Sequence, residues 1–269
     1  MTQQHSSNDY VGFMTLLNPK ERKHLLDNLC SIVSEFIGTG MLMLFGCMGC
    51  MNSELFPSTN VTRSLNFGFV VLIIIQCFGC CSGAHLNPAV SVAAYIYELI
   101  SLPMVAAYIV AQIVGAYCGY GLLTVLLPEN QVFVPGSDTG LCMTSIHHDI
   151  DVWQALGIEV CITATLIIVC CGVWDPRNKC QQDSVAIRFG LAVACLSITA
   201  GPLTGASMNP ARSLAPALWH NDFRNHWVYW MGPLIGAFIA APIYKCVFRR
   251  EIEEKCESTP TKMNEVQCS

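Results

Sequence analysis

The sequence predicts an all-α membrane protein with six transmembrane helices and two shorter re-entrant half-helices, arranged as an inverted repeat. Three observations support this fold class: the composition, six long apolar segments, and a short motif that occurs twice. Of the 269 residues, 53% are hydrophobic and only 12% are charged. Soluble domains carry charge on roughly a quarter of their residues, so the lipid bilayer is the expected solvent and binding partner.

Six apolar segments are long enough to cross the hydrocarbon layer, which is about 30 Å thick. They cover residues 28–50, 64–81, 102–127, 153–174, 185–201 and 227–248. Two further stretches, 84–98 and 205–218, are too short to cross the bilayer but too apolar for ordinary loops. We expect these two stretches to enter the membrane as half-helices and return.

Basic residues are divided unequally between the two sides of this topology. They gather before the first span, between the fourth and fifth spans, and after the sixth, whereas the opposite side has only Arg63, Arg212 and Arg224. The positive-inside rule therefore places both termini in the cytoplasm, and we expect the plasma membrane as the location. Residues 1–27 are then a cytoplasmic segment, residues 28–250 form the channel domain, and the polar residues 251–269 are predicted to be a disordered cytoplasmic tail.

Composition and spacing also exclude several classes of function. The sequence has no clustered nucleophile, base or metal ligands, so we expect no enzyme. It has no basic stripe for nucleic acid. Most of the sixteen cysteines lie in apolar runs, where a thiol behaves as a small hydrophobe. Cys47 and Cys50 form a C-x-x-C pair, but no second pair completes a zinc site, so we expect neither metal nor cofactor.

Two polar features lie in the predicted outer loops. Asn60 begins the sequon Asn60-Val61-Thr62 and is a candidate for glycosylation. His147 and His148, followed by Asp149, are residue types that bind metals, but surface polarity explains them more simply.

The motif that occurs twice reveals a duplicated chain. Residues 82–91, SGAHLNPAVS, and residues 204–213, TGASMNPARS, align at a constant offset of 122 with six identities in ten positions. Glu35 and Glu159 precede the two motifs at similar distances. The half-repeats cover about 28–127 and 153–250, and three spans in each half invert the second copy relative to the first. We interpret the two glutamates as hydrogen-bond anchors for re-entrant backbone.

Each motif has the chemistry of a helix start inside a pore. Asparagine suits the N-cap, proline suits the first helical position, and alanine permits close packing. The residues are Asn87, Pro88 and Ala89 in the first motif and Asn209, Pro210 and Ala211 in the second. The positive ends of both half-helices would meet at the pore centre, where the amides donate to neutral solutes and the field repels protons and cations.

Through these two motifs the sequence resembles the aquaporin family, the major intrinsic proteins, from about residue 28 to residue 250. The resemblance implies a passive channel for water and small uncharged solutes that assembles as a homotetramer. It also implies a narrow filter formed by Phe67, Ser197, Ala206 and Arg212. His85 is expected at the cytoplasmic mouth of the pore, where it either narrows the opening or fixes the half-helix.

The filter residues predict which solutes pass. Strict water channels of the family commonly have a histidine where this chain has Ser197, so Ser197 and Ala206 leave a wider opening. In this respect the sequence is similar to insect glycerol-permeable aquaporins, the entomoglyceroporins, and we expect glycerol and urea to pass with water. Ser213, Ala217 and the pair Tyr229-Trp230 instead resemble the water-selective branch.

Three alternatives remain open at this point. The chain could be a strict water channel, or a poorly conducting structural or adhesion member of the same fold. A coupled transporter would need acidic or ion-binding groups at the broken helices, where this sequence has neutral amides.

Overall fold

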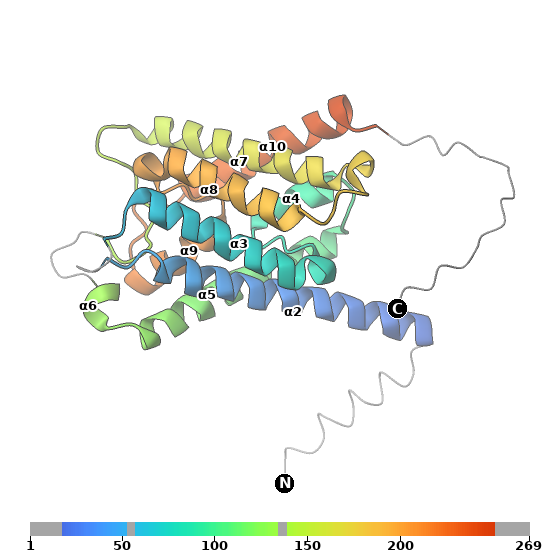
Figure 1. The fold of residues 1–269 in the computed structure, drawn as a ribbon, viewed down its shortest axis with the longest axis horizontal. Helices are drawn as coiled ribbons and strands as arrows, with labels where there is room; N and C mark the ends of the chain where they lie inside the picture. Colours follow the sequence, from blue (N-terminus) through green and yellow to red (C-terminus); the bar gives the residue numbers. More distant parts are fainter. Residues whose placement is uncertain (1–17, 53–56, 134–138, 251–269) are drawn as a thin grey trace, which may run out of the picture.

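The computed structural model describes residues 18–52, 57–133 and 139–250, and all regular structure in these ranges is helical (Figure 1). Six long helices form one bundle: α2 (Pro19–Met48), α3 (Asn60–Ser82), α5 (Leu102–Leu126), α7 (Val152–Trp174), α8 (Val185–Thr204) and α10 (Val228–Ile243). Each is long and apolar enough to cross a membrane, the last together with the turn that follows it. The predicted six-helix membrane fold is confirmed.

Two shorter helices, α4 (Pro88–Ile96) and α9 (Pro210–His220), enter the bundle from opposite ends (Figure 1). We call the end where α2 begins and α10 is followed by η2 (Tyr244–Phe248) the terminal end. The opposite end carries α6 (Glu129–Val132) and the outer part of α9. We call it the disulfide end, for the bond described below. The described chain thus begins and finishes at the same end, as an even number of spans requires.

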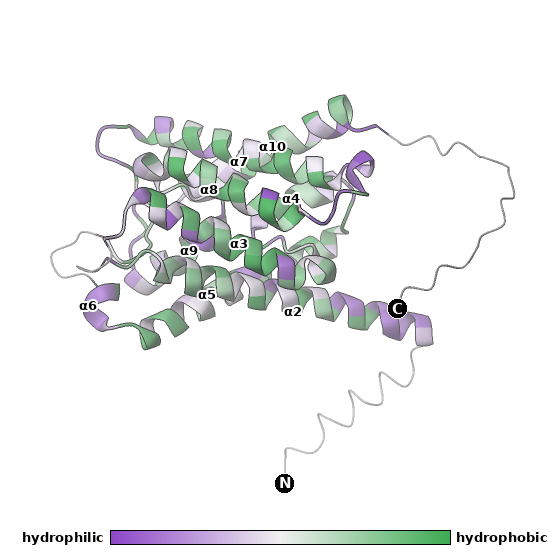
Figure 2. Ribbon diagram, in the orientation of Figure 1, coloured by the Kyte–Doolittle hydropathy of each residue, from purple (hydrophilic) through white to green (hydrophobic). Residues whose placement is uncertain are grey.

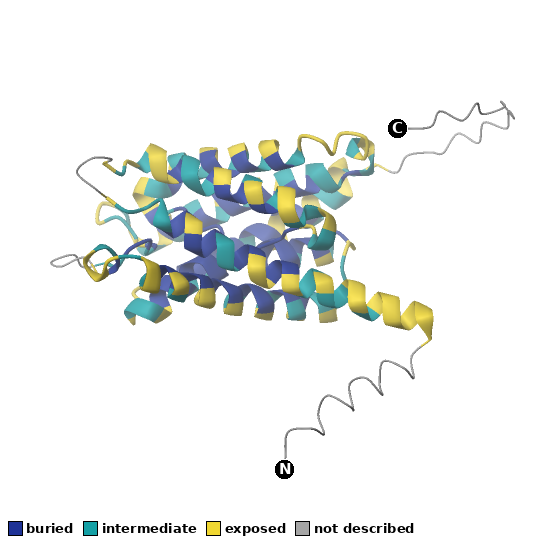
Figure 3. Ribbon diagram, turned by 60° about the horizontal axis from the view of Figure 1, so that its bottom comes forward, coloured by how far each residue is buried: buried dark blue, intermediate teal, exposed yellow. Residues whose placement is uncertain are grey.

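The first helix begins earlier than its predicted apolar span. Asn18 caps α2, Pro19 occupies its first position, and the Glu21 side chain accepts from the backbone N–H of Asn18 to complete a capping box. The helix therefore starts nine residues before the predicted boundary at residue 28. Residues 19–27 are mostly exposed and project from the bundle (Figure 3). Residues 1–17 and the predicted tail 251–269 lie outside the described residues.

The bundle is packed inside and apolar outside. Gly115 and Gly119 on α5 let this helix approach α2 closely, because a Cβ at either position would collide with the α2 backbone at Phe36 or Gly40. The ribbons of the long helices are largely hydrophobic (Figure 2). Many of their large apolar residues are exposed on the outer surface, and Val125 is 79% exposed. This distribution is expected when the surrounding solvent is lipid.

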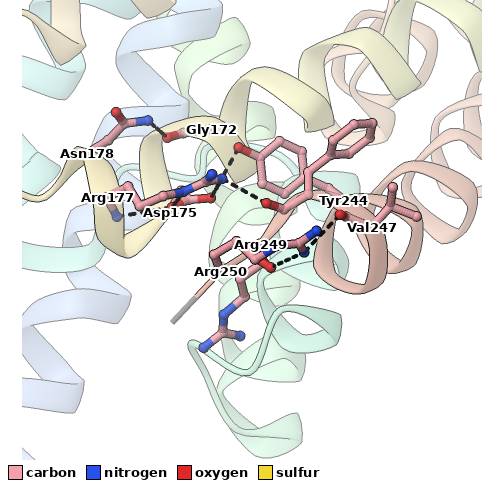
Figure 4. A network of polar contacts seen from close by, with 9 residues as sticks. Gly172, Asp175, Arg177, Asn178, Tyr244, Val247, Arg249 and Arg250 are labelled. Carbon is pink, nitrogen blue, oxygen red and sulfur yellow. Dashed lines mark hydrogen bonds and ion pairs between the residues drawn. The ribbon is translucent and has the colours of Figure 1, made fainter. Parts of the chain in front are cut away.

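The sixth span is shorter than predicted as an α-helix, because α10 ends at Ile243 and a π-helical turn, η2, follows. A polar network fixes this turn against the short helix η1 (Pro176–Asn178) (Figure 4). Arg177 donates to both carboxylate oxygens of Asp175, at 2.8 and 2.7 Å, and to the carbonyl oxygen of Phe248 at 2.7 Å. The Arg177 guanidinium lowers the pKa of Asp175 to about 2.

A disulfide joins Cys47, near the end of α2, to Cys142, which lies 95 residues later in the connection between α6 and α7. The sequence analysis gave Cys47 no partner, so this bond is a feature that it missed. Cys47 is fully buried, and Cys142 adopts a left-handed backbone conformation with φ of 65°. Cys50, the other half of the C-x-x-C pair, is a free thiol.

Candidate functional site

The site is built on two matching backbone turns that lead into α4 and α9. Both turns pass through the left-handed region of backbone conformation at three corresponding positions: Gly83, Ala84 and Leu86 in the first, and Gly205, Ala206 and Met208 in the second. Non-glycine residues rarely hold such angles, so the surroundings must fix them. In each half a buried glutamate does so.

Glu35 on α2 fixes the first turn by accepting four hydrogen bonds. The backbone N–H groups of His85 and Leu86 donate to its carboxylate at 2.8 and 2.7 Å. The Ser82 hydroxyl donates at 2.6 Å, and the side-chain amide of Gln112 donates at 2.8 Å. A fully buried carboxylate is acceptable here because four donors surround it.

Glu159 on α7 fixes the second turn in the same way but with one partner fewer among the described residues. The backbone N–H groups of Ser207 and Met208 both donate to it at 2.9 Å, and the Thr204 hydroxyl donates at 2.7 Å. The predicted anchor role of the two glutamates agrees with these contacts.

The two asparagines of the motifs connect the halves to each other. The side-chain amide of Asn87 donates to the carbonyl oxygen of Met208, and that of Asn209 donates to the carbonyl oxygen of Leu86, both at 2.7 Å. Their side-chain oxygens accept from the first turns of α4 and α9, as N-caps. Each amide nitrogen has two N–H groups and donates one of them to the opposite half.

A cavity of about 570 Å³ connects these asparagines to the disulfide end of the bundle. All four predicted filter residues line it, together with His85 and both asparagines: Phe67, His85, Asn87, Ser197, Ala206, Asn209 and Arg212. These seven residues come from α3, α8 and the two re-entrant segments. The structure therefore brings the predicted filter residues, His85 and the two asparagines together. Cys50 and Cys142 line the same cavity and were not predicted there. Cys195, by contrast, is exposed on the bundle surface.

Two arginines line this cavity, and whereas Arg63 is exposed, Arg212 is buried, at only 8% exposed. One guanidinium nitrogen donates to the carbonyl oxygen of Cys142 at 2.7 Å. The guanidinium carbon lies 5.0 Å from the ring centroid of Phe67, a distance at which the ring face attracts a cation. The charge is thus fixed between the aromatic ring and the segment that carries Cys142.

The residues that resemble the water-selective branch lie behind this lining. Ser213 is buried and bonds to the hydroxyls of Ser207 and Thr144, at 2.6 and 3.0 Å. Tyr229 is also buried, and its hydroxyl donates to the carbonyl oxygen of Thr204. Neither residue lines the cavity.

His85 lies at the terminal end of the cavity lining with its ring fixed by neighbours. Its Nδ1 is 3.1 Å from the Ser91 hydroxyl, and its ring packs edge-on against Tyr108. These contacts agree with the interpretation of a histidine that supports the half-helix.

Asn60 is the first residue of α3, and its side-chain amide donates to the carbonyl oxygen of Ile198 at 2.9 Å. A glycan on this nitrogen would replace one of its two N–H hydrogens and leave one to donate. The ligand atoms of His147, His148 and Asp149 lie within 4.8 Å of one another on the exposed surface of the disulfide end. The backbone N–H of Asp149 bonds to the His147 ring, which a simple surface turn explains.

Comparisons with known proteins agree with this architecture. The family model "Major intrinsic protein" matches residues 23–244. Aquaporin-4 of Mus musculus is 35% identical over 84% of this chain and 69% of its own length. The lens fiber major intrinsic protein of Gallus gallus is 33% identical over 84% of this chain and 85% of its own. Among solved structures, the aquaglyceroporin from Plasmodium falciparum superposes with a TM-score of 0.72 and 25% identity, covering 82% of this chain and 96% of that one.

Proposed function

Because the chain belongs to the major intrinsic protein family, and is therefore an integral membrane channel for water and small solutes rather than an enzyme, we propose that glycerol and urea pass with water through a filter widened at Ser197. One observation carries this proposal. Phe67, Ser197, Ala206 and Arg212 line a single cavity that leads to the paired asparagines. Two of these four side chains are small.

The chemistry of this lining suits a polyol or an amide. A solute there meets an apolar wall on the Phe67 side and hydrogen-bonding groups on Ser197 and Arg212. Glycerol has the same two characters, a carbon backbone and hydroxyls, and urea has an amide carbonyl that the guanidinium can bind. An imidazole at position 197 would fill part of this space.

Ions and protons are excluded in this proposal by two positive features. The N-termini of α4 and α9 point their partial positive charge toward the asparagines, and Arg212 adds a full charge nearby. A cation would meet both while losing its hydration shell. A neutral solute replaces lost water contacts with the asparagine amides.

The strict water channel remains the second candidate, because Ser213, Ala217 and Tyr229-Trp230 resemble that branch. Ser213 and Tyr229 lie outside the cavity lining, however, and act by supporting the backbone of the second turn. The bore depends first on the residues that face the solute. We therefore favour a wider filter, of the kind that the resemblance to insect glycerol-permeable aquaporins implies.

The assembly and orientation are proposed from the family and the charge distribution. We propose a homotetramer in the plasma membrane with both termini in the cytoplasm. Basic side chains gather at the terminal end, in the first turns of α2, around η1 and at η2: Lys20, Arg22, Lys23, Arg177, Lys179, Lys245 and Arg249. Such an excess favours the cytoplasmic side.

Stopped-flow light scattering on proteoliposomes tests the proposal. Vesicles containing the unmodified protein should shrink rapidly under an impermeant osmolyte, and re-swell rapidly when glycerol or urea replaces it. A trapped pH-sensitive dye should report no faster proton entry than in empty vesicles. Fast shrinkage without re-swelling would establish the strict water channel instead, and slow shrinkage would favour a structural role.

A further inference from the structure

The segment of residues 139–151, which leads into α7, is tied to the site at residue 142 by both a covalent bond and a hydrogen bond. The side chain of Cys142 is bonded to Cys47 on α2, and its carbonyl oxygen accepts from Arg212. The disulfide therefore connects the charged group of the filter to the end of the first transmembrane helix.

Nothing else in the described part of the chain accepts a hydrogen bond from the Arg212 side chain. The other N–H groups of this guanidinium are not among the buried side-chain atoms that lack a partner, so they face the cavity, and the Cys142 carbonyl is the contact that fixes the charge to the wall. The position of this carbonyl depends on the left-handed conformation of Cys142, which a β-carbon disfavours. Covalent attachment to α2 holds the residue in it.

The same segment has other attachments, which would survive loss of the disulfide. Its Leu141 carbonyl accepts from the Tyr120 hydroxyl at 2.7 Å, and its Thr144 hydroxyl bonds to Ser213 at 3.0 Å. The backbone N–H of His147 donates to the carbonyl oxygen of Leu203 at 2.8 Å. Breaking the disulfide should therefore free residue 142 locally while the segment stays on the bundle.

We propose that the Cys47–Cys142 disulfide is a positioning device for the filter: it holds the Cys142 carbonyl at Arg212, and its reduction loosens solute selection without unfolding the channel. This inference rests on the proposed function, since it requires Arg212 to stand in the selective part of the pore. The disulfide then makes the channel's selectivity sensitive to thiol reductants added on the side of the membrane that the disulfide end faces.

Cys142 belongs to the cavity lining and is the less buried of the two bonded cysteines, at 9% exposed against 0% for Cys47, so we write the attack of a small dithiol at its sulfur. One thiolate of the reductant attacks the Cys142 sulfur, forming a mixed disulfide and releasing Cys47 as a thiolate. The second thiol of the reductant then closes its own disulfide and releases Cys142. The protein gains two electrons and the reductant loses two.

The test measures the ratio of glycerol to water permeability, and proton entry, in proteoliposomes of the full chain before and after treatment with dithiothreitol. Reduction is verified by the mass of the alkylated protein. We expect the glycerol-to-water ratio or the rate of proton entry to rise roughly tenfold. This is the change in rate expected when one charge-assisted hydrogen bond is lost. The double variant Cys47→Ser with Cys142→Ser should show the same change without reductant.

Two further variants separate positioning from simple structural support. Cys50→Ser removes the free thiol of the same cavity and should respond to dithiothreitol as the unmodified protein does. Arg212→Ala should be less selective from the start, and reduction should change it no further, because both steps act through one contact. If the disulfide had a merely structural role, its reduction would lower the thermal midpoint and leave the permeability ratio unchanged.

The outcomes distinguish this inference from the proposed function. If Arg212→Ala leaves selectivity unchanged, the proposed filter is wrong and the inference is wrong with it. If Arg212→Ala alters selectivity but verified reduction of the folded protein does not, only the inference is overturned. The inference would also be overturned if reduction changed the selectivity of the unmodified protein and of Arg212→Ala equally, since the disulfide would then act through another group.

Discussion

The two half-helices, α4 and α9, start from the same backbone turn but present different side chains to the cavity. Both turns use the same left-handed positions and a buried glutamate, and the two asparagines exchange equivalent hydrogen bonds. At the position 122 residues apart where α4 has Val90, however, α9 has Arg212. The two halves share the backbone turn, whereas the side chains that line the cavity at this position differ between them.

The anchors also differ, in the number of donors that surround each carboxylate. Glu35 accepts from Gln112 in addition to the donors that have equivalents at Glu159. The side-chain oxygen of Gln112 is buried and has no hydrogen-bond partner. The first half therefore contains an amide that could turn over and offer an acceptor.

This difference gives the largest expected effect, in the paired variants Glu35→Gln and Glu159→Gln. In each, an amide N–H₂ group replaces one carboxylate oxygen and faces backbone donors. Gln112 can turn its oxygen toward the new amide at position 35. The Leu86 N–H loses its acceptor at position 35, as the Met208 N–H does at position 159, but the described partners of Glu159 include no side-chain amide that could turn as Gln112 can. We expect Glu159→Gln to lower the free energy of unfolding by about 2 to 4 kcal/mol, and Glu35→Gln to lower it clearly less.

The measurement is the thermal midpoint of both purified variants in the same detergent. Replacing Gln112 by leucine in the Glu35→Gln background should remove the advantage of the first half. Equal midpoints for the two single variants would show that Gln112 provides no compensation.

The smallest expected effect tests a part of the molecule outside the duplicated core, the network at Asp175. The folded pKa of Asp175 is about 2, below its ordinary value, so its contribution to stability is present above about pH 4. It is lost as the pH falls from about 4 to about 2. Arg177 is half exposed, so solvent weakens the pair, and we expect Asp175→Asn to cost about 1 kcal/mol at pH 6.

At pH 3 the difference in thermal midpoint between Asp175→Asn and the unmodified protein should shrink, because protonation of the native carboxylate weakens its pair with Arg177 there. Thermal midpoints at the two pH values measure it. The permeability ratio should not change at pH 6, because the network lies at the terminal end, away from the filter. A difference in midpoint that persists unchanged at pH 3 would contradict the assigned pKa shift.

Much of the fold could be predicted because it depends on patterns that are local or repeated. The Asn-Pro-Ala motifs specify an N-cap and a first-turn proline, and α4 and α9 begin at those prolines. The early start of α2 was also readable in principle, since Asn18, Pro19 and Glu21 form a capping sequence. A search for apolar length alone overlooked it.

What could not be predicted depends on contacts between distant residues. Cys47 is one of sixteen cysteines, and no spacing distinguishes Cys142 as its partner across 95 residues. The acceptor for Arg212 is a backbone carbonyl, which every residue has, so the sequence carries no signal for it. Cys50 reaches the cavity only because of the way in which the end of α2 lies beside the filter.

We infer that Ser197, in the second half of the chain, widens a pore whose backbone both halves share and whose filter also includes Phe67 of the first half. The most direct test compares Ser197→His with Ser197→Ala in proteoliposomes, by stopped-flow measurement of glycerol and water permeability. We predict that the histidine lowers the glycerol-to-water ratio about tenfold or more, because it fills the space beside Arg212, while alanine, which preserves that space, changes it less than about twofold. An unchanged ratio in a folded, water-conducting Ser197→His channel would contradict the account.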